Sequence, residues 1–420
     1  MTSYERGVSV IGLGYIGLPT SAVLADHGLR VHGVDTDPRV VEALNRGTVH
    51  IVEPDLDEVV RRVVDAGRLT ASADMVAADV YVVAVPTPLV DDHQPDLRHV
   101  EHAARAIAPL LRGDELVILE STCPPGSTAR MSAWIAEERP DLRLPHEHPE
   151  SPDVHVAHCP ERVLPGHTLA ELVSNNRVVG GLTPECGRRA AALYELFVEG
   201  EISLTDAASA EMAKLVENTF RDVNIAFANE LAEVCDHLGL DVWQVIELAN
   251  HHPRVQVLQP GPGVGGHCIA VDPWFIAAAA PEQSRLIRQA REVNDARPQQ
   301  VVDRVDRIAA TGATVACLGL AFKPDVDDMR ESPAVTVVQR LAQTRPDLQL
   351  LVVEPYAETL PGALAPYDNV VLSDREKALE LSDVVLLLVH HADFVDLDPA
   401  LLQDKQVVDT RGIWRRSRSG

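Results

Sequence analysis

The sequence lacks the features that define several other classes of protein. Its six cysteines lie far apart and include no Cys-x-x-Cys pair. This excludes a disulfide framework and a cysteine-rich zinc site, and it indicates a reduced, cytoplasmic protein. No apolar run is long enough to span a bilayer, and the N-terminal residues do not resemble a secretory signal. Short-period repeats and low-complexity tracts are also missing.

Positive charge is scarce. The chain has 37 Lys and Arg residues against 63 Asp and Glu residues, a formal net charge of -26. A field of that sign disfavours nonspecific binding to nucleic acid or to anionic membranes, so we expect neither as a partner. An anionic substrate would need its own basic pocket. The 420 residues, 46% of them apolar, are enough for two or three globular domains.

Short apolar segments alternate with amphipathic helical stretches in two parts of the chain. We predict an α/β fold, with two Rossmann-like doubly wound parallel-sheet domains joined by a long central helix at 206–238. Gly239 is placed to end that helix. The predicted domains are 1–204, 205–300 and 301–420. Predicted strands are 8–13, 30–34, 80–85, 115–120, 154–158, 177–180, 314–319, 349–354, 384–389 and 406–409.

A glycine-rich turn connects the first strand to the first helix. Gly12, Gly14 and Gly17 form a Gly-x-Gly-x-x-Gly pattern there, with Tyr15 and Ile16 inside it. The helix N-terminus would hold a pyrophosphate. Asp35 ends the second strand, where an acid would accept hydrogen bonds from a ribose 2′-hydroxyl and repel a 2′-phosphate. The pattern therefore predicts NAD as cofactor; a glycine-rich turn without nucleotide is the alternative.

Three threonines lie near the expected ends of the third and fourth strands. Because strand carboxyl ends face the ligand crevice of an open parallel sheet, we expect Thr87 and Thr122 beside the cofactor. Thr128 opens the next helix and is a weaker candidate. The alternative for Thr87 and Thr128 is a helix cap or a turn residue.

A second glycine-rich segment precedes a cysteine. Gly261, Gly263, Gly265 and Gly266 remove side chains just before Cys268, so that a ligand could approach the backbone closely. A free cysteine is commonly a small buried core residue. The polar neighbours His267 and Asp272 argue against such burial here. We predict a presented thiol that acts as a nucleophile.

The long helix carries a polar stripe beside its apolar one. Lys214, Asn218 and Arg221 are spaced by four and three residues, which places them on one face. Such a stripe alone is usually a solvated face. Together with Cys268, it could instead hold an oxyanion, a phosphate or a carboxylate.

Five motifs resemble those of the UDP-glucose/GDP-mannose dehydrogenase family in the right order, across nearly the whole chain. The resemblance is closest to the UDP-N-acetyl-D-mannosamine 6-dehydrogenase branch. The motifs are Cys159-Pro-Glu-Arg-Val-Leu-Pro-Gly166, Glu211-Met-Ala-Lys-Leu-Val-Glu-Asn-Thr-Phe-Arg-Asp222, His252-Pro-Arg254, Gly261–Asp272 and Phe322-Lys-Pro-Asp-Val-Asp-Asp-Met-Arg-Glu-Ser332.

The resemblance implies a four-electron oxidation at C6 of a nucleotide sugar, with two NAD per substrate. Cys268 would capture the intermediate aldehyde as a thiohemiacetal, which gives a thioester and then a carboxylate. Lys214 and Asn218 would stabilise the oxyanion and position water, and Asp272 would assist proton transfer. Glu161 is a further candidate acid or base.

One motif departs from the family pattern. Where UDP-glucose dehydrogenases have a second glutamate, four residues after Glu161, this chain has Pro165. Lys214 then becomes the first choice for the acid/base role and Glu161 the second. Arg162 stands where UDP-glucose enzymes have an apolar residue, which agrees with a different sugar, such as one with an N-acetyl group.

The resemblance also implies binding residues and an assembly. Lys323 would close over the nucleotide from a UDP-sugar-binding domain, Arg330 would lie nearer the cofactor, and the 252–254 loop would reach the neighbouring site of a homodimer joined along the long helix. Read without the resemblance, Arg254 and Arg330 would be surface salt-bridge residues. The candidate substrate-binding residues are Arg162, Val163, Lys214, Asn218, Arg221, His252, Arg254, Gly265 and Lys323.

Four histidines, at 146, 148, 155 and 158, have irregular spacing, and we expect them to be solvated rather than to bind a metal. UDP-N-acetylglucosamine and UDP-glucose remain alternative substrates. A single-step hydroxyacid dehydrogenase with an idle Cys268 would yield one NADH per substrate, and a non-catalytic nucleotide-binding protein would yield none.

Overall fold

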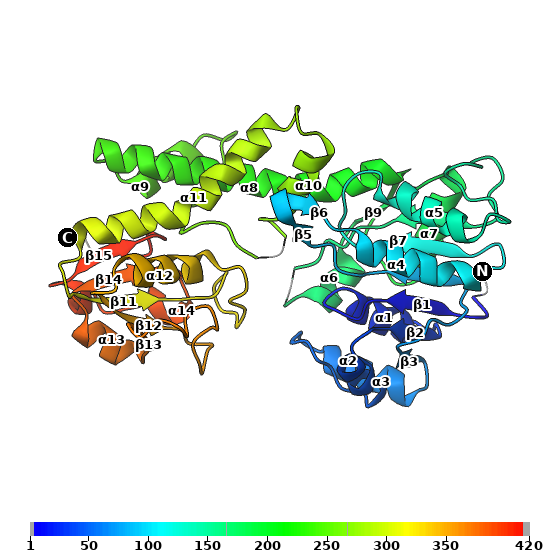
Figure 1. Cartoon of the computed structure of the whole chain (residues 1–420), viewed down its shortest axis with the longest axis horizontal. Coiled ribbons are helices and arrows are strands. Elements are labelled where there is room, and N and C mark those ends of the chain that lie inside the picture. Colours follow the sequence, from blue (N-terminus) through cyan, green and yellow to red (C-terminus); the bar gives the residue numbers. More distant parts are fainter. Residues whose placement is uncertain (1–3, 165, 267, 415–420) are drawn as a thin grey trace. The chain divides into compact units, whose positions relative to one another are not determined.

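The computed structural model describes residues 4–164, 166–266 and 268–414. Its contacts divide the chain into two compact units (Figure 1). The first runs up to Glu217 and includes Trp274–Pro281. The second comprises Asn218–Pro273 and the residues from Glu282 onward. Pro165 and His267, on which two of the sequence-based arguments depend, lie outside the described residues.

The first unit is built on an eight-stranded sheet with the order β10-β9-β8-β7-β4-β1-β2-β3. The predicted doubly wound parallel arrangement is confirmed, except that β9 pairs antiparallel with β8 near one edge. The predicted strands are present, whereas β3 and β10 were not foreseen. The strands are β1 Val8–Ile11, β2 Val31–Val34, β3 Leu69–Ser72, β4 Val80–Val83, β7 Leu116–Leu119, β8 His155–His158, β9 Arg177–Gly181 and β10 Ile202–Asp206.

Both faces of this sheet are covered. In β4, Val80 and Val82 pack into one hydrophobic cluster, and Tyr81 and Val83 into another, because successive side chains point to opposite faces. The covering helices are α1 Gly17–Asp26, α2 Pro38–Asn45, α3 Leu56–Asp65, α4 Arg98–Ile107, α5 Ser127–Glu138, α6 Thr168–Ser174 and α7 Pro184–Tyr194. A small hairpin, β5 Leu89–Val90 and β6 Gln94–Pro95, follows β4.

The second unit contains a five-stranded parallel sheet with the order β13-β12-β11-β14-β15. Along β11, Val315 and Cys317 face one buried cluster while Ala316 and Leu318 face the other. The strands are β11 Thr314–Leu318, β12 Gln349–Val353, β13 Val370–Leu372, β14 Val384–Leu387 and β15 Gln406–Asp409; the helices are α12 Pro333–Thr344, α13 Arg375–Leu381 and α14 Ala392–Val395.

The predicted long helix is α8, Ala207–Leu238, 32 residues in length (Figure 1, green). It ends as expected at Gly239, which has a φ of 69°, and the Leu240 N–H donates to the carbonyl of Cys235. Three further helices are α9 Val242–Asn250, α10 Asp272–Ala279 and α11 Arg285–Ile308.

The prediction that the histidines are solvated is wrong for two of them. His155 and His158 lie on β8 rather than in the preceding loop, and they are 5% and 0% exposed. Burial lowers the pKa of His158 to about 3, so its ring is neutral. Both faces of β8 are covered, so the side chains at its two ends are buried although they point to opposite faces. Among the described residues, no helix is long and apolar enough to cross a membrane.

Candidate active site

The three glycines of the N-terminal turn serve different physical purposes. Gly12 has a φ of 90°, and a Cβ there would lie 2.5 Å from the Ala84 carbonyl oxygen. A Cβ on Gly17 would lie 1.8 Å from the Gly12 carbonyl oxygen. Gly14 is different, because a Cβ on it would meet no atom of the described chain within 4 Å. Gly12 and Gly17 therefore shape the turn, while Gly14 leaves room for a ligand.

Asp35 fixes the same turn from the end of β2. One carboxylate oxygen accepts the Leu13 N–H at 2.9 Å, and the other accepts the Asp37 N–H at 2.9 Å. An acid held at this place, beside an open Gly14 and the N-terminus of α1, fits the ribose and pyrophosphate of NAD. The exposed Tyr15 and half-buried Ile16 lie within this turn.

Two substitutions separate folding from cofactor binding. Gly17→Ala should destabilise the protein by roughly 1–3 kcal/mol, because a methyl group is forced against the backbone. Gly14→Ala should leave the melting temperature nearly unchanged but weaken NAD binding, because its methyl group enters the space left for the ligand. Thermal unfolding and NAD titration of both variants check this. If Gly14→Ala bound NAD normally, the ligand would lie elsewhere.

The segments that follow β4 and β7, which were predicted to flank the cofactor, are joined by a hydrogen bond. The Thr87 hydroxyl donates to the carbonyl oxygen of Thr122 at 2.6 Å, which ties the segment after β4 to the segment after β7. Thr128 differs, because it is 1% exposed and its hydroxyl donates to Glu211 at 2.6 Å. Thr128 lies in the first turn of α5, whose N-cap is Gly126, and its place beside the cofactor stays a prediction.

Glu211 was not singled out from the sequence, although it opens the second motif. It is 1% exposed and accepts the backbone N–H groups of Gly126 at 2.5 Å and Thr128 at 2.7 Å. Its carboxylate therefore caps α5 from α8, three residues before Lys214. The possible ligand atoms of Glu211, Cys123 and His158 lie within 4.8 Å of one another. Because donors of α5 already occupy the carboxylate, we interpret this group as a helix cap.

The predicted nucleophile of the second unit, the thiol of Cys268, lies at the surface as expected. Cys268 is exposed, whereas the other five cysteines are buried. Its carbonyl oxygen accepts the N–H of Asp272 at 2.9 Å, which joins the thiol-bearing turn to the start of α10. The Asn218 side chain donates to the Asp272 carboxylate at 2.6 Å, and both residues are buried. The structure thus joins three of the predicted catalytic residues.

The remaining members of the polar stripe have different surroundings. Lys214 is half-buried, lies one turn before Asn218 on α8 and belongs to the first unit. Arg221 is exposed. A four-residue spacing on a helix places Lys214 and Asn218 on the same face, as predicted.

The glycines before Cys268 are needed for packing within the protein. A Cβ on Gly265 would lie 2.4 Å from the Glu331 carbonyl oxygen, and one on Gly263 would lie 2.9 Å from Pro333. Gly266 faces the ring of Phe322. These glycines let the loop pack against the chain's own 322–333 segment, and the approach of a ligand to this backbone stays a prediction.

A buried polar network, also missed from the sequence, holds this loop. The Asn229 side chain accepts the Gly261 N–H at 2.9 Å and donates to Asn294 at 2.9 Å. The Arg297 side chain donates to the Gly261 carbonyl at 3.0 Å. Asn294 donates in turn to Asp222 at 2.8 Å. Helices α8 and α11 thereby fix the start of the segment that carries Cys268.

The candidate anion-binding residues of the first unit are partly engaged. The Arg162 guanidinium pairs with Glu217 at 2.5 Å, and the Arg162 N–H donates to Glu161 at 2.6 Å. Val163 packs against the hydrophobic core. An incoming phosphate would therefore compete with Glu217 for Arg162.

The candidates of the second unit lie on loops. His252 and Arg254 are exposed after α9, where the Arg254 N–H donates to the His252 ring at 3.3 Å. Arg330 pairs with Asp328 at 2.8 Å, in line with the surface salt-bridge interpretation. The Lys323 ammonium lies 5.7 Å from the centre of the Phe322 ring.

The second unit repeats part of the N-terminal turn. Gly319 follows β11 with a φ of 89°, and Glu354 follows β12 as Asp35 follows β2. The Glu354 carboxylate accepts the N–H groups of Leu320 at 2.6 Å and Ala321 at 3.0 Å. Ala321 and Pro324 replace the second and third glycines of the pattern, so the repeat is incomplete. Its structure does not favour a second dinucleotide site.

Comparison with known proteins decides the family. Sequence models of the NAD binding domain, the central domain and the UDP binding domain of the UDP-glucose/GDP-mannose dehydrogenase family match residues 6–198, 208–296 and 316–416. The chain belongs to this family. It is an NAD-dependent nucleotide-sugar dehydrogenase, and its first unit carries the glycine turn and Asp35 that fit NAD.

Several relatives match nearly the whole dehydrogenase. The chain is 55% identical over 415 residues to an NDP-N-acetyl-D-galactosaminuronic acid dehydrogenase of Ralstonia nicotianae (98% of this chain, 97% of the relative). It is 52% identical over 418 residues to the UDP-N-acetyl-D-mannosamine dehydrogenase of Escherichia coli K12 (97% and 99%). The solved UDP-D-ManNAc dehydrogenase of Pyrococcus horikoshii has 37% identity and a TM-score of 0.85 (97% and 95%).

Proposed function

We propose that this dehydrogenase oxidises UDP-N-acetyl-D-mannosamine at C6 to the corresponding uronic acid, consuming two NAD. The observation that carries the proposal is the exposed Cys268, joined through its own turn to the buried Asn218–Asp272 pair. A single oxidation to an aldehyde needs no nucleophile, whereas a second hydride transfer needs a covalent adduct from which hydride can leave.

The reaction has two stages. In the first, the C6 alcohol loses a proton and a hydride and becomes an aldehyde. In the second, the Cys268 sulfur adds to the aldehyde carbon to form a thiohemiacetal, which loses hydride to become a thioester. Water then breaks the carbon–sulfur bond and releases the carboxylate. The glycine turn and Asp35 would hold NAD, and the bound nicotinamide would supply the hydride acceptor for both stages.

Residues of α8 would stabilise the charge that develops on C6 oxygen. Lys214 and Asn218 share one face and donate hydrogen bonds to that oxygen. One N–H of Asn218 is directed to Asp272, which fixes the orientation of the amide and leaves its other N–H for the substrate. Asp272 is 3% exposed and is the candidate acceptor of a proton beside the thiol. Lys214 remains the first choice for the proton of the C6 alcohol, and Glu161 the second.

The identity to a relative named for a different N-acetyl sugar favours a second candidate substrate. The Ralstonia relative, whose name specifies N-acetyl-D-galactosaminuronic acid, is 55% identical to this chain. The two sugars differ in ring stereochemistry. Both share the N-acetyl group that the Arg162 position suggested. UDP-N-acetylgalactosamine is therefore the second candidate.

The test is the NADH yield per sugar. Limiting UDP-N-acetylmannosamine, UDP-N-acetylgalactosamine, UDP-N-acetylglucosamine and UDP-glucose would each be incubated with excess NAD. Two NADH from the first sugar alone support the proposal. Two NADH from another sugar alone would reassign the substrate, and one NADH from any sugar would leave Cys268 idle. A yield of none from every sugar would contradict the proposed activity.

We also propose a homodimer, formed in the cytoplasm along α8. Phe220, Phe227 and Val234 recur every seven residues and are 65%, 52% and 47% exposed, followed by Leu238 at 61%. An apolar stripe of this kind favours a second copy of the same helix as its partner. The exposed 252–254 loop is then free to contribute Arg254 to the neighbouring site.

The substitution Phe227→Glu should convert the dimer to a monomer, because it places charge in the middle of the stripe. Light scattering after size-exclusion chromatography measures the mass. Leu381→Glu is the control, since Leu381 is 54% exposed at the end of α13 in a different part of the unit. A wild-type mass of one chain, or a dimer that survives Phe227→Glu, would contradict this interface.

A further inference from the structure

Two glutamates and one arginine are buried together at the carboxyl edge of the first sheet. Glu120 directly follows β7, Glu161 lies three residues after β8, and Arg177 is the first residue of β9. Their exposed fractions are 1%, 7% and 4%. Ionised side chains are rarely buried without a partner of opposite charge. The number of positive and negative charges in this group therefore indicates whether each carboxyl group is ionised or protonated.

The contacts divide the group into two halves. Arg177 pairs with Glu161 at 3.2 Å, and another nitrogen of its guanidinium lies 3.7 Å from the Cys159 sulfur. The guanidinium also lies 4.9 Å from the centre of the Tyr194 ring. Glu120 has no such cation at hydrogen-bond distance among the described residues.

Neutral hydroxyl groups surround Glu120 instead. The Tyr194 hydroxyl, from the last residue of α7, donates to one oxygen at 2.7 Å. The Thr20 hydroxyl, from α1, lies 3.3 Å from the other. Glu120 is therefore held by α1 and α7 while Glu161 is held by Arg177.

One cation cannot balance two buried carboxylates. Burial, followed by the negative charge of Glu161, raises the pKa of Glu120 to about 7. Burial also raises the pKa of the Cys159 thiol to about 11 and that of Tyr194 well above its ordinary value, so both stay neutral. The charged groups facing Glu120 are thus Glu161 and Arg177. A proton on Glu120 leaves the buried group electrically balanced.

We propose that Glu120 is a positioning residue: while it carries a proton, Arg177 is left to hold Glu161, the candidate acid/base at the sugar. This inference rests on the proposed function. Glu120 directly precedes Ser121 and Thr122, whose strand end flanks the cofactor. When Glu120 loses its proton, its negative charge competes with Glu161 for Arg177.

Glu120→Gln tests this, because an amide keeps the shape and can pair with both hydroxyls but cannot ionise. The pKa of Glu120 is raised in the folded protein, so its stabilising contribution is present at low pH and lost as pH rises through about 7. From about pH 5 to about pH 9, the unfolding constant of wild type should rise on the order of 10²-fold relative to Glu120→Gln. Glu380→Gln, at an exposed position, should show no such trend.

Kinetics give the second readout. The pH profile of kcat in wild type should contain an ionisation near pH 7, which Glu120→Gln should remove while a substantial kcat remains. A relative stability that does not change with pH would show that Glu120 is ionised throughout and would overturn the inference. A pH-dependent stability with an unchanged kinetic profile would also overturn it, because the buried proton would then be structural only.

Glu161→Gln provides a measurement that does not depend on activity. Removing the charge of Glu161 should lower the pKa of Glu120, so the pH-dependent fall in the stability of this variant should be smaller and should level off at a lower pH than in wild type. An unchanged midpoint would contradict the coupling even if the proposed substrate were correct. Conversely, failure of every UDP-sugar in the NADH assay would leave this result intact.

Discussion

Replacement of Cys268 by serine should reduce acid release by on the order of 10³-fold or more, since loss of a covalent nucleophile can cost as much as about 10⁶-fold in kcat. Serine has nearly the same size, but its hydroxyl ionises far less readily than a thiol and is a much weaker nucleophile than a thiolate. Because Cys268 is exposed, the substitution leaves no cavity and the fold should persist. Chromatography of the UDP-sugar products, with NADH counted in parallel, measures the effect.

The control is Cys235→Ala, which removes a buried thiol from the cluster between α8 and α9. That variant should be less stable yet still yield two NADH per substrate. If Cys268→Ser released acid at the wild-type rate, the covalent mechanism would be wrong and the glycine-flanked cysteine would be a structural residue.

Replacement of Arg291 by alanine should lower the free energy of unfolding by about 3–5 kcal/mol, the usual cost of breaking a buried ion pair by removing one partner. Arg291 is 1% exposed and pairs at 2.6 Å with Asp222, which is 0% exposed. It also pairs with Asp295. Burial raises the pKa of Asp222 even with the guanidinium beside it. Without Arg291, the carboxylate must be buried unpaired or take up a proton.

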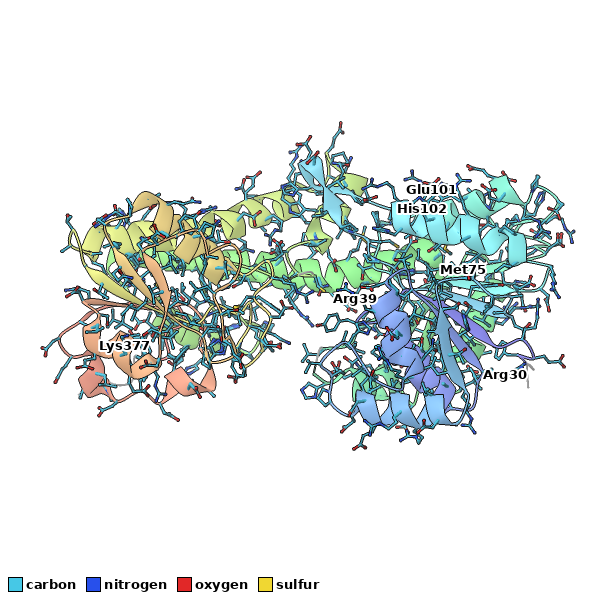
Figure 2. All side chains as sticks on the ribbon, turned by 60° about the horizontal axis from the view of Figure 1, so that its bottom comes forward. Arg30, Arg39, Met75, Glu101, His102 and Lys377 are labelled. Carbon is cyan, nitrogen blue, oxygen red and sulfur yellow. The ribbon has the colours of Figure 1, made fainter. Side chains whose placement is uncertain are left out.

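The same substitution should disturb the site. Asp222 accepts the amide of Asn294, which binds Asn229 and, through it, the loop at Gly261. Chemical denaturation measures the loss, and kcat of the folded fraction measures the disturbance. Arg39→Ala is the control, because Arg39 projects from α2 into solvent and its side chain is 89% exposed (Figure 2). Equal losses in the two variants would contradict the importance of the buried pair.

The secondary structure could be predicted because its signals are local. Strands such as β1 and β11 are short apolar runs, and α8 has a clear helical period, so their boundaries were predicted to within one or two residues. The glycine turn and Asp35 were predictable for the same reason, since the whole fingerprint lies within one strand–helix–strand unit. The resemblance of the five motifs then placed Cys268, Asn218 and Asp272 in one reaction.

The burial and the charge pairing of individual site residues depend on segments far apart in the chain. The sequence by itself determined the two α/β domains, the NAD-type turn and the family, because each is encoded by patterns within a short segment or by motifs in order. Only the tertiary structure decided that His158 is buried, that Glu211 caps a helix 83 residues away, and that Glu120 shares a buried site with Glu161. Burial and charge pairing arise from contacts between distant segments, and no local period records them.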